Sequence, residues 1–211
     1  MTTQFLIRSV EAALTHADET TEPLLLPEVK GMTGWKVQHF LNRMCQELTP
    51  DCRYLEVGVH RGATFFAALY RNSIRATGYE NWSQFDEDKT ARADFERSLE
   101  LYDPDNTVLF FERDFFAEPL KHVETYNVYF YDGEHAEGPQ SKALAHALPA
   151  MESSFIFIVD DWTWPLVKTW TMESLDALHI TPKASWERKQ TCEGFDPQGW
   201  WNGLAVFVIE K

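Results

Sequence analysis

Basic residues are scarce in this sequence of 211 residues. Lysine and arginine number 19 together, against 33 aspartates and glutamates, so the formal net charge is −14 at pH 7. Proteins that bind nucleic acids use clustered basic side chains to displace counterions. The chain has no basic run and no basic helix face. We therefore expect no nucleic-acid partner, and a small molecule is the better candidate for the substrate.

Cysteine and long apolar runs are also rare. Cys45, Cys52 and Cys192 form no C-x-x-C pair, which argues against a thiolate metal site and favours reduced thiols in a cytoplasmic protein. No apolar stretch has the roughly 20 residues that span a bilayer, and the first residues lack the pattern of a signal peptide. We expect a cytoplasmic protein with no membrane partner, and the sequence leaves open whether it forms a homo-oligomer.

Hydrophobic residues make up 44% of the chain, as in a globular domain. Residues 1–50 have the apolar spacing of helices, and from residue 53 onward apolar strands alternate with amphipathic helices. Strands are expected at 53–57, 76–80, 107–113, 127–132, 155–160, 184–191 and 204–210, with helices at 63–71, 86–101, 140–148 and 166–178. This α/β alternation predicts a doubly wound, mostly parallel seven-stranded sheet with the last strand antiparallel. Residues 1–50 would form a helical extension or lid, and residues 51–211 the ligand-binding domain.

The first strand runs directly into a glycine motif, Glu56-Val57-Gly58-Val59-His60-Arg61-Gly62. Glycine lets the backbone turn tightly and approach a ligand, and the helix that follows directs free N–H groups toward it. A dinucleotide-binding strand would carry G-x-G-x-x-G, so the spacing disfavours an oxidoreductase of that kind.

The spacing Glu-x-Gly-x-x-x-Gly resembles the first motif of class I S-adenosylmethionine-dependent methyltransferases. The fuller form of that motif is acid-x-Gly-x-Gly-x-Gly, so His60 replaces the middle glycine. The resemblance covers about residues 53–211 and implies a Rossmann-like methyltransferase fold with S-adenosylmethionine as the cofactor. It places Glu56 near the methionine amino group, with Gly58, His60 and Gly62 forming the turn against the cofactor.

An acid ends each of the first five predicted strands, and ligands of open α/β sheets bind outside the carboxyl ends of the strands. By the same resemblance, Glu80 matches the acid that accepts both ribose hydroxyls, with Asn81 beside it. Asp114 matches the acid near the adenine amino group, and Phe115 is placed to pack on the adenine ring.

The strand ends at Asp132-Gly133-Glu134-His135 and at Asp160-Asp161 carry a second resemblance. It is to small-molecule O-methyltransferases of the macrocin type, which have Asp-Gly-x-His after strand four and an Asp pair after strand five. The resemblance implies that Asp132, Asp160 and Asp161 hold Mg²⁺ or another divalent cation, which lowers the pKa of an acceptor hydroxyl. His135 then acts as the general base. Asp132 is also expected to be catalytic, as the metal ligand beside His135, and to border the cofactor.

We therefore expect methyl transfer from S-adenosylmethionine to a small-molecule hydroxyl, on a sugar or natural-product intermediate, assisted by a metal if the three carboxylates converge. Two alternatives stay open. One is a metal-independent N-methyltransferase, and the other is a non-catalytic cofactor-binding protein of methyltransferase ancestry, which His60 in the glycine motif favours. Trp162 and Trp164 follow the Asp pair and are expected to stack on the acceptor. Residues 31–35 are expected to belong to a lid, and the acceptor itself is not identified.

Overall fold

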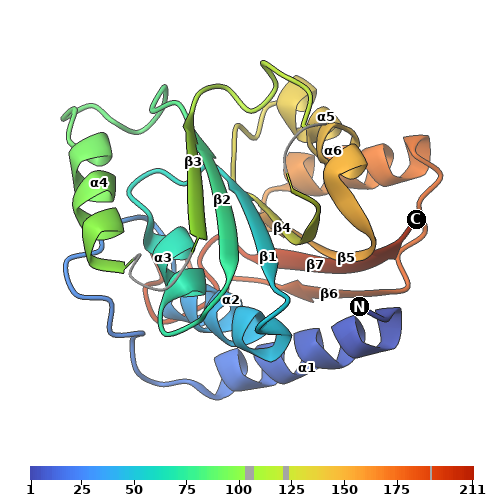
Figure 1. Cartoon of the computed structure of the whole chain (residues 1–211), viewed down its shortest axis with the longest axis horizontal. Coiled ribbons are helices and arrows are strands. Elements are labelled where there is room, and N and C mark those ends of the chain that lie inside the picture. The colour runs from blue at the N-terminus through green and yellow to red at the C-terminus, as the bar shows by residue number, and fades with distance from the viewer. Residues whose placement is uncertain (103–106, 121–123, 191) are drawn as a thin grey trace.

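A central sheet of seven strands organises the part of the chain that the computed structural model describes, residues 1–102, 107–120, 124–190 and 192–211 (Figure 1). The strands lie in the order β3-β2-β1-β4-β5-β7-β6. Their bounds are β1 (Arg53–Val57), β2 (Arg75–Glu80), β3 (Thr107–Glu112), β4 (Tyr126–Tyr131), β5 (Met151–Asp160), β6 (Ala184–Arg188) and β7 (Leu204–Glu210). The strands from β3 to β5 pair in parallel, and β7 runs antiparallel to β5 and β6. The predicted fold class is confirmed.

Helices cover both faces of this sheet (Figure 1). One face carries α1 (Thr3–Glu19), α2 (Trp35–Leu48), α3 (Ala63–Leu69) and α4 (Ala91–Tyr102), and the other carries α5 (Glu137–Ala147) and α6 (Pro165–Ala177), with a short 3₁₀ turn at Leu148–Ala150. Successive residues of a strand point to opposite faces, so Val206 belongs to the first apolar core and Phe207 to the second. Among the helices described, none is long and apolar enough to cross a membrane.

The two N-terminal helices share their core with the sheet. Leu6 of α1 and Phe40 of α2 are fully buried in one cluster with Val128 and Ile156. In addition, the Asp18 carboxylate accepts a hydrogen bond from the Trp200 indole at 3.0 Å and pairs with Arg188 at 2.6 Å. The boundary at residue 50 therefore stays a prediction, and the packing favours one continuous unit.

Several predicted elements have other bounds in the structure: β5 begins at Met151 and α5 at Glu137, ahead of the predicted 155 and 140, and two further elements are shorter than expected. The helix predicted at 86–101 begins at Ala91, because Phe85 and Lys89 have positive φ angles of 53° and 55° that an α-helix does not accommodate. Asp86 instead accepts a hydrogen bond from the Ala91 N–H at 3.0 Å and forms a turn ahead of the helix. The strand predicted at 184–191 ends at Arg188, and residue 191 lies outside the described residues.

Candidate active site

The carboxyl ends of β1 to β5 open into one cavity of about 700 Å³. Two other segments complete its wall, Gly31 and Met32 from the N-terminal part and Trp201 and Asn202 from the C-terminal part. Most of the predicted site residues line this cavity, namely Gly58, His60, Glu80, Asn81, Asp114, Phe115, Asp132, His135, Asp160 and Asp161. Parallel strands bring their carboxyl ends to one edge of the sheet, which is why residues up to 103 positions apart meet there.

Glu80, at the end of β2, is held in place by backbone N–H groups. Its Oε2 accepts from His60 at 2.7 Å, and its Oε1 accepts from Asn81 at 2.8 Å and from Trp82 at 2.7 Å. A carboxylate has about four positions for donors, so one position on Oε2 remains for a ligand. The turn around Glu80 therefore fixes the direction in which the carboxylate can bind a hydroxyl.

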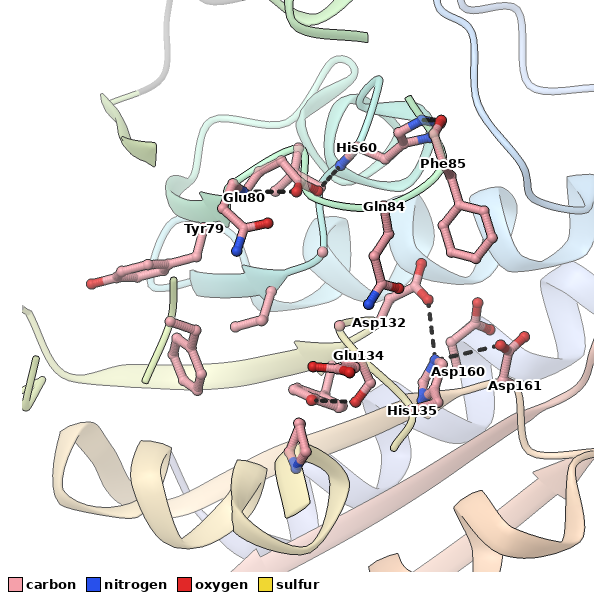
Figure 2. Close-up of a pocket in the computed structure, with 18 of the residues that line it drawn as sticks. His60, Tyr79, Glu80, Gln84, Phe85, Asp132, Glu134, His135, Asp160 and Asp161 are labelled. Carbon is pink, nitrogen blue, oxygen red and sulfur yellow. Dashed lines mark hydrogen bonds and ion pairs between the residues drawn. The ribbon is translucent and has the colours of Figure 1, made fainter. Parts of the chain in front are cut away.

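His60 adopts a conformation that glycine favours. Its φ angle is 48°, in the left-handed region that few residues other than glycine adopt. The imidazole Nε2 lies 3.0 Å from the Phe85 carbonyl oxygen, and Figure 2 shows the ring beside Phe85, far from Asp132. His60, which stands where the motif has its middle glycine, thus gains a contact with the loop after β2. Its side chain points toward that loop.

Glu56 and Gly62 lie behind the cavity wall. Glu56 is fully buried and accepts hydrogen bonds from the Tyr54 hydroxyl at 2.5 Å and the Thr64 hydroxyl at 2.6 Å. Burial raises the pKa of Glu56 to about 8, so this side chain is largely neutral at pH 7. Gly62 precedes α3 with a φ of 94°, and a Cβ there would lie 2.2 Å from the Phe66 ring. Their contacts with a cofactor stay predictions, and in the structure both residues shape the wall.

Asp132, Asp160 and Asp161 gather around His135, at the opposite end of the cavity from Glu80 (Figure 2). We call these four residues the acidic end. His135 Nε2 lies 3.6 Å from Asp132 Oδ1 and 3.4 Å from Asp161 Oδ2. Burial, together with repulsion between the acids, raises the pKa of Asp132 and of Asp160 well above the usual range. Such a group of carboxyls is stabilised by an added positive charge.

The predicted divalent-cation site is not supported by the side-chain arrangement. Among the described residues, no group of three or more His, Cys, Asp and Glu side chains has an arrangement that could hold a metal ion. Mg²⁺ requires a nearly octahedral set of oxygens at about 2.0–2.1 Å. The three carboxylates do converge, which was the condition that the sequence pattern set for a metal site. Convergence alone, however, does not provide the coordination geometry that a metal ion needs.

His135 is oriented by residues that the sequence did not reveal. Its Nδ1 lies 2.8 Å from Gln140 Oε1, and Gln140 Nε2 donates to Thr171 Oγ1 at 2.8 Å. The Gln140 carbonyl oxygen accepts only from an N–H, so in this arrangement Nδ1 carries the proton, and Nε2 faces the carboxylates of Asp132 and Asp161. Gln140 and Thr171 are each 2% exposed, so water does not compete for these bonds. The sequence held one signal for Gln140: it is a polar residue on the same helical face as the apolar Ala143 and Leu144, which indicates a buried polar contact.

The tryptophans after the Asp pair have different positions. Trp164 lines the cavity, is 46% exposed, and lies with its ring centroid 6.0 Å from that of His135. Trp162 is buried and packs against Phe207 at 5.7 Å. Trp162 is absent from the described cavity lining, whereas Trp201 belongs to it. The sequence did not single out Trp201. Its segment, which connects the antiparallel strands β6 and β7, reaches the cavity only because of how these strands are placed in the sheet.

The fold has counterparts among solved structures, although no family model and no curated protein matches the sequence. A proposed O-methyltransferase from Klebsiella pneumoniae is similar with a TM-score of 0.56 and 14% identity, over 98% of this chain and 90% of that chain. Precorrin-6y C5,15-methyltransferase from Geobacter metallireducens GS-15 gives 0.58 and 14%, over 93% and 97%. SMU.776, a proposed methyltransferase in complex with S-adenosylhomocysteine, gives 0.53 and 14%, over 81% and 49%. The likeness establishes a Rossmann-like methyltransferase fold.

Proposed function

We propose that this chain is an S-adenosylmethionine-dependent methyltransferase whose acceptor is a hydroxyl group of a small molecule. The observation that carries the proposal is the division of one cavity into two chemically different ends. Glu80 lies at one end beside Tyr79, against which Phe115 packs, and the acidic end lies at the other. This division provides one place for a cofactor and another for an acceptor.

The residues at the first end fit the cofactor. Glu80 retains one free acceptor position for a ribose hydroxyl. Phe115, packed edge-on against Tyr79 at 5.3 Å, offers a rigid apolar surface for a flat ring. A Cβ on Gly58 would lie 1.8 Å from the Asp132 carbonyl oxygen, so glycine lets the turns after β1 and β4 come together under the ligand. When bound, S-adenosylmethionine supplies a methyl group activated by its sulfonium charge.

His135 is the proposed general base. Its Nε2, which has no hydrogen-bond partner among the described residues, would accept the proton of the acceptor hydroxyl while the methyl group passes from the sulfonium sulfur to the oxygen, leaving S-adenosylhomocysteine. Asp132 and Asp161, at 3.6 and 3.4 Å, then stabilise the imidazolium. Gln140 keeps the ring in place by accepting from Nδ1. The alignment of acceptor and methyl group supplies much of the remaining rate enhancement.

Cofactor binding tests this proposal directly. We expect S-adenosylhomocysteine, and not NAD, to raise the melting temperature of the protein, because a ligand of the native state stabilises it by mass action. In calorimetry, Glu80→Ala should weaken S-adenosylhomocysteine by about 1.5–3 kcal/mol, the range of hydrogen bonds to charged groups. Glu173→Ala, at an exposed position on α6, is the control. A folded wild-type protein that does not bind S-adenosylhomocysteine would refute the proposal.

The alternatives are separated by activity. Methyl transfer to a hydroxyl that survives EDTA supports a metal-free mechanism, whereas activity restored only by Mg²⁺ supports the metal predicted from sequence. Transfer only to amines supports the N-methyltransferase. Cofactor binding without turnover on any acceptor supports a non-catalytic protein, an alternative that the outward position of His60 no longer favours.

A further inference from the structure

The charges around the cavity are unbalanced. Six carboxyl side chains line it: Glu80, Asp114, Asp132, Glu134, Asp160 and Asp161. The arginines in the lining are Arg61 and Arg113, and both are engaged in ion pairs. Arg61 binds Asp88 at 2.7 Å and also Asp94, and Arg113 binds Glu118 at 2.7 Å. No lysine belongs to the described lining, so a negatively charged acceptor would meet no free cationic side chain there.

A second observation indicates that a donor belongs at the acidic end. Asp160 is only 7% exposed, and its Oδ1 has no hydrogen-bond partner among the described residues. Buried carboxylate oxygens are normally paired, because an unpaired one loses its hydration without compensation. Asp161, next to it and also in the cavity wall, is 9% exposed. Asp161 contacts His135 at 3.4 Å and bonds Asn202, but a carboxylate has about four acceptor positions, so both aspartates retain capacity for N–H donors.

An aromatic side chain borders the acidic end, and further apolar side chains line the same cavity. Trp164, Trp201 and Met32 line the same cavity, and Trp164 stands edge to face with His135 at 6.0 Å. The faces of tryptophan rings attract organic cations as well as apolar groups. The rim thus suits the hydrocarbon part of a ligand whose charged group binds the carboxylates.

We propose that the acceptor carries a protonated amine, which donates hydrogen bonds to Asp160 and Asp161 while Trp164 covers its hydrocarbon part. The inference rests on the proposed function and assigns its substrate class, a cationic amine that also bears the hydroxyl to be methylated. An ammonium suits this site better than a metal ion, because its three donors need no fixed coordination geometry. A phosphorylated or carboxylated acceptor is disfavoured, because the carboxylates of the acidic end would repel its negative charge.

Three phenols of similar size test the charge preference. Tyramine carries an ammonium group, 4-ethylphenol is neutral, and 4-hydroxyphenylpropanoate carries a carboxylate. Their binding to the wild-type protein, saturated with S-adenosylhomocysteine and free of metal through EDTA, is measured by calorimetry at neutral pH. We expect tyramine to bind at least about tenfold tighter than 4-ethylphenol, and the carboxylate to bind weakest. Equal affinities, or no binding of tyramine, would overturn the proposal, and S-adenosylhomocysteine binding shows separately whether the proposed function stands.

Two variants locate the preference. Asp160→Asn, and independently Asp161→Asn, should reduce the tyramine preference over 4-ethylphenol to about twofold or less, because each variant removes one carboxylate from the ammonium site. Asp176→Asn makes the same charge change at an exposed position on α6, outside the cavity lining, and should keep the full preference. Unchanged affinity for S-adenosylhomocysteine confirms that each variant is folded. If the tyramine preference persists in both cavity variants, the carboxylates have another role. The same conclusion follows if added Mg²⁺ displaces tyramine from the wild-type protein.

Discussion

At the scale of single residues, His135 is the side chain on which the proposed chemistry depends. Replacing His135 by alanine should lower kcat by about 10²–10⁴-fold, the usual contribution of a general base. The affinity for S-adenosylhomocysteine should not change, because His135 lies at the acidic end and Glu80 at the other. Steady-state kinetics and calorimetry on the same preparation check both statements.

The control for this variant is His16→Ala, at an exposed position on α1, which should keep the wild-type rate. If His135→Ala also retains most of its rate on the true acceptor, the proton is removed by another group or the acceptor is a nitrogen that needs no base. His135 would then be a structural residue of the turn after β4.

Glu56 gives the protein a pH-dependent stability. Its folded-state pKa of about 8 exceeds the usual value for glutamate, about 4.3. Between these two values the unfolded chain releases the proton and the folded chain keeps it, so the wild type loses stability as pH rises through this window. Glu56→Gln does not titrate, and its amide can still bond the hydroxyls of Tyr54 and Thr64.

We therefore expect the stability of Glu56→Gln, relative to the wild type, to increase by about 2–5 kcal/mol between pH 5 and pH 8.5. Urea denaturation at several pH values measures this difference. Glu173→Gln, on the exposed surface of α6, should follow the wild type at every pH. A difference for Glu56→Gln that stays flat would mean that Glu56 is ionised in the folded protein.

At the scale of elements, the close approach of the turns after β1 and β4 builds the cavity. Gly58 has a φ of 90°, and a Cβ there would meet the Asp132 carbonyl oxygen at 1.8 Å. Gly58→Ala should therefore destabilise the protein by about 1–3 kcal/mol from backbone strain alone. It should also weaken S-adenosylhomocysteine, because the two turns are forced apart.

A second glycine offers a matched control for this variant. Gly138, in the first turn of α5, has open space around its Cβ position and no positive φ. Gly138→Ala should leave cofactor binding unchanged and raise stability by up to about 1 kcal/mol. Thermal melting and calorimetry of both variants make the comparison. Equal behaviour of the two would show that the β1–β4 contact does not shape the site.

At the scale of the whole molecule, α1 decides whether residues 1–50 are an extension or part of the domain. Leu6, Val10 and Leu14 are buried against the sheet, and each contributes about 1.5–3 kcal/mol by burial. Their sum is comparable to the total stability of a typical domain, about 5–15 kcal/mol. Deleting residues 1–20 should therefore give a protein without a cooperative melting transition.

A substitution in the same helix separates polar contacts from apolar packing. Asp18→Ala removes the contacts with Arg188 and Trp200 but keeps the apolar face of α1, and should lower stability by only about 1 kcal/mol. Circular dichroism melting curves of both proteins are the measurement. If the shortened chain melts cooperatively near the wild-type temperature, residues 1–50 are the separable extension that the sequence suggested.

The sequence by itself determined the order of strands and helices along the chain, the antiparallel end of the sheet and the polar residues that the strand ends bring to the cavity. Each of these follows from information that lies close together in the chain. The apolar periodicity identifies an element, and the residue after a parallel strand must lie at the carboxyl edge of the sheet. Glu80, Asp132 and His135 were found for this reason.

Tertiary structure alone decided which of these groups reach the cavity and what surrounds them. Glu56 follows the same strand-end pattern as Glu80, yet Tyr54 and Thr64 enclose it behind the wall. Gln140 reaches the acidic end from α5, and Trp201 reaches the cavity from the segment before β7. Strand β7 itself lies between β5 and β6 in the sheet. Packing between segments far apart in the chain sets these positions, and no local pattern of residues records it.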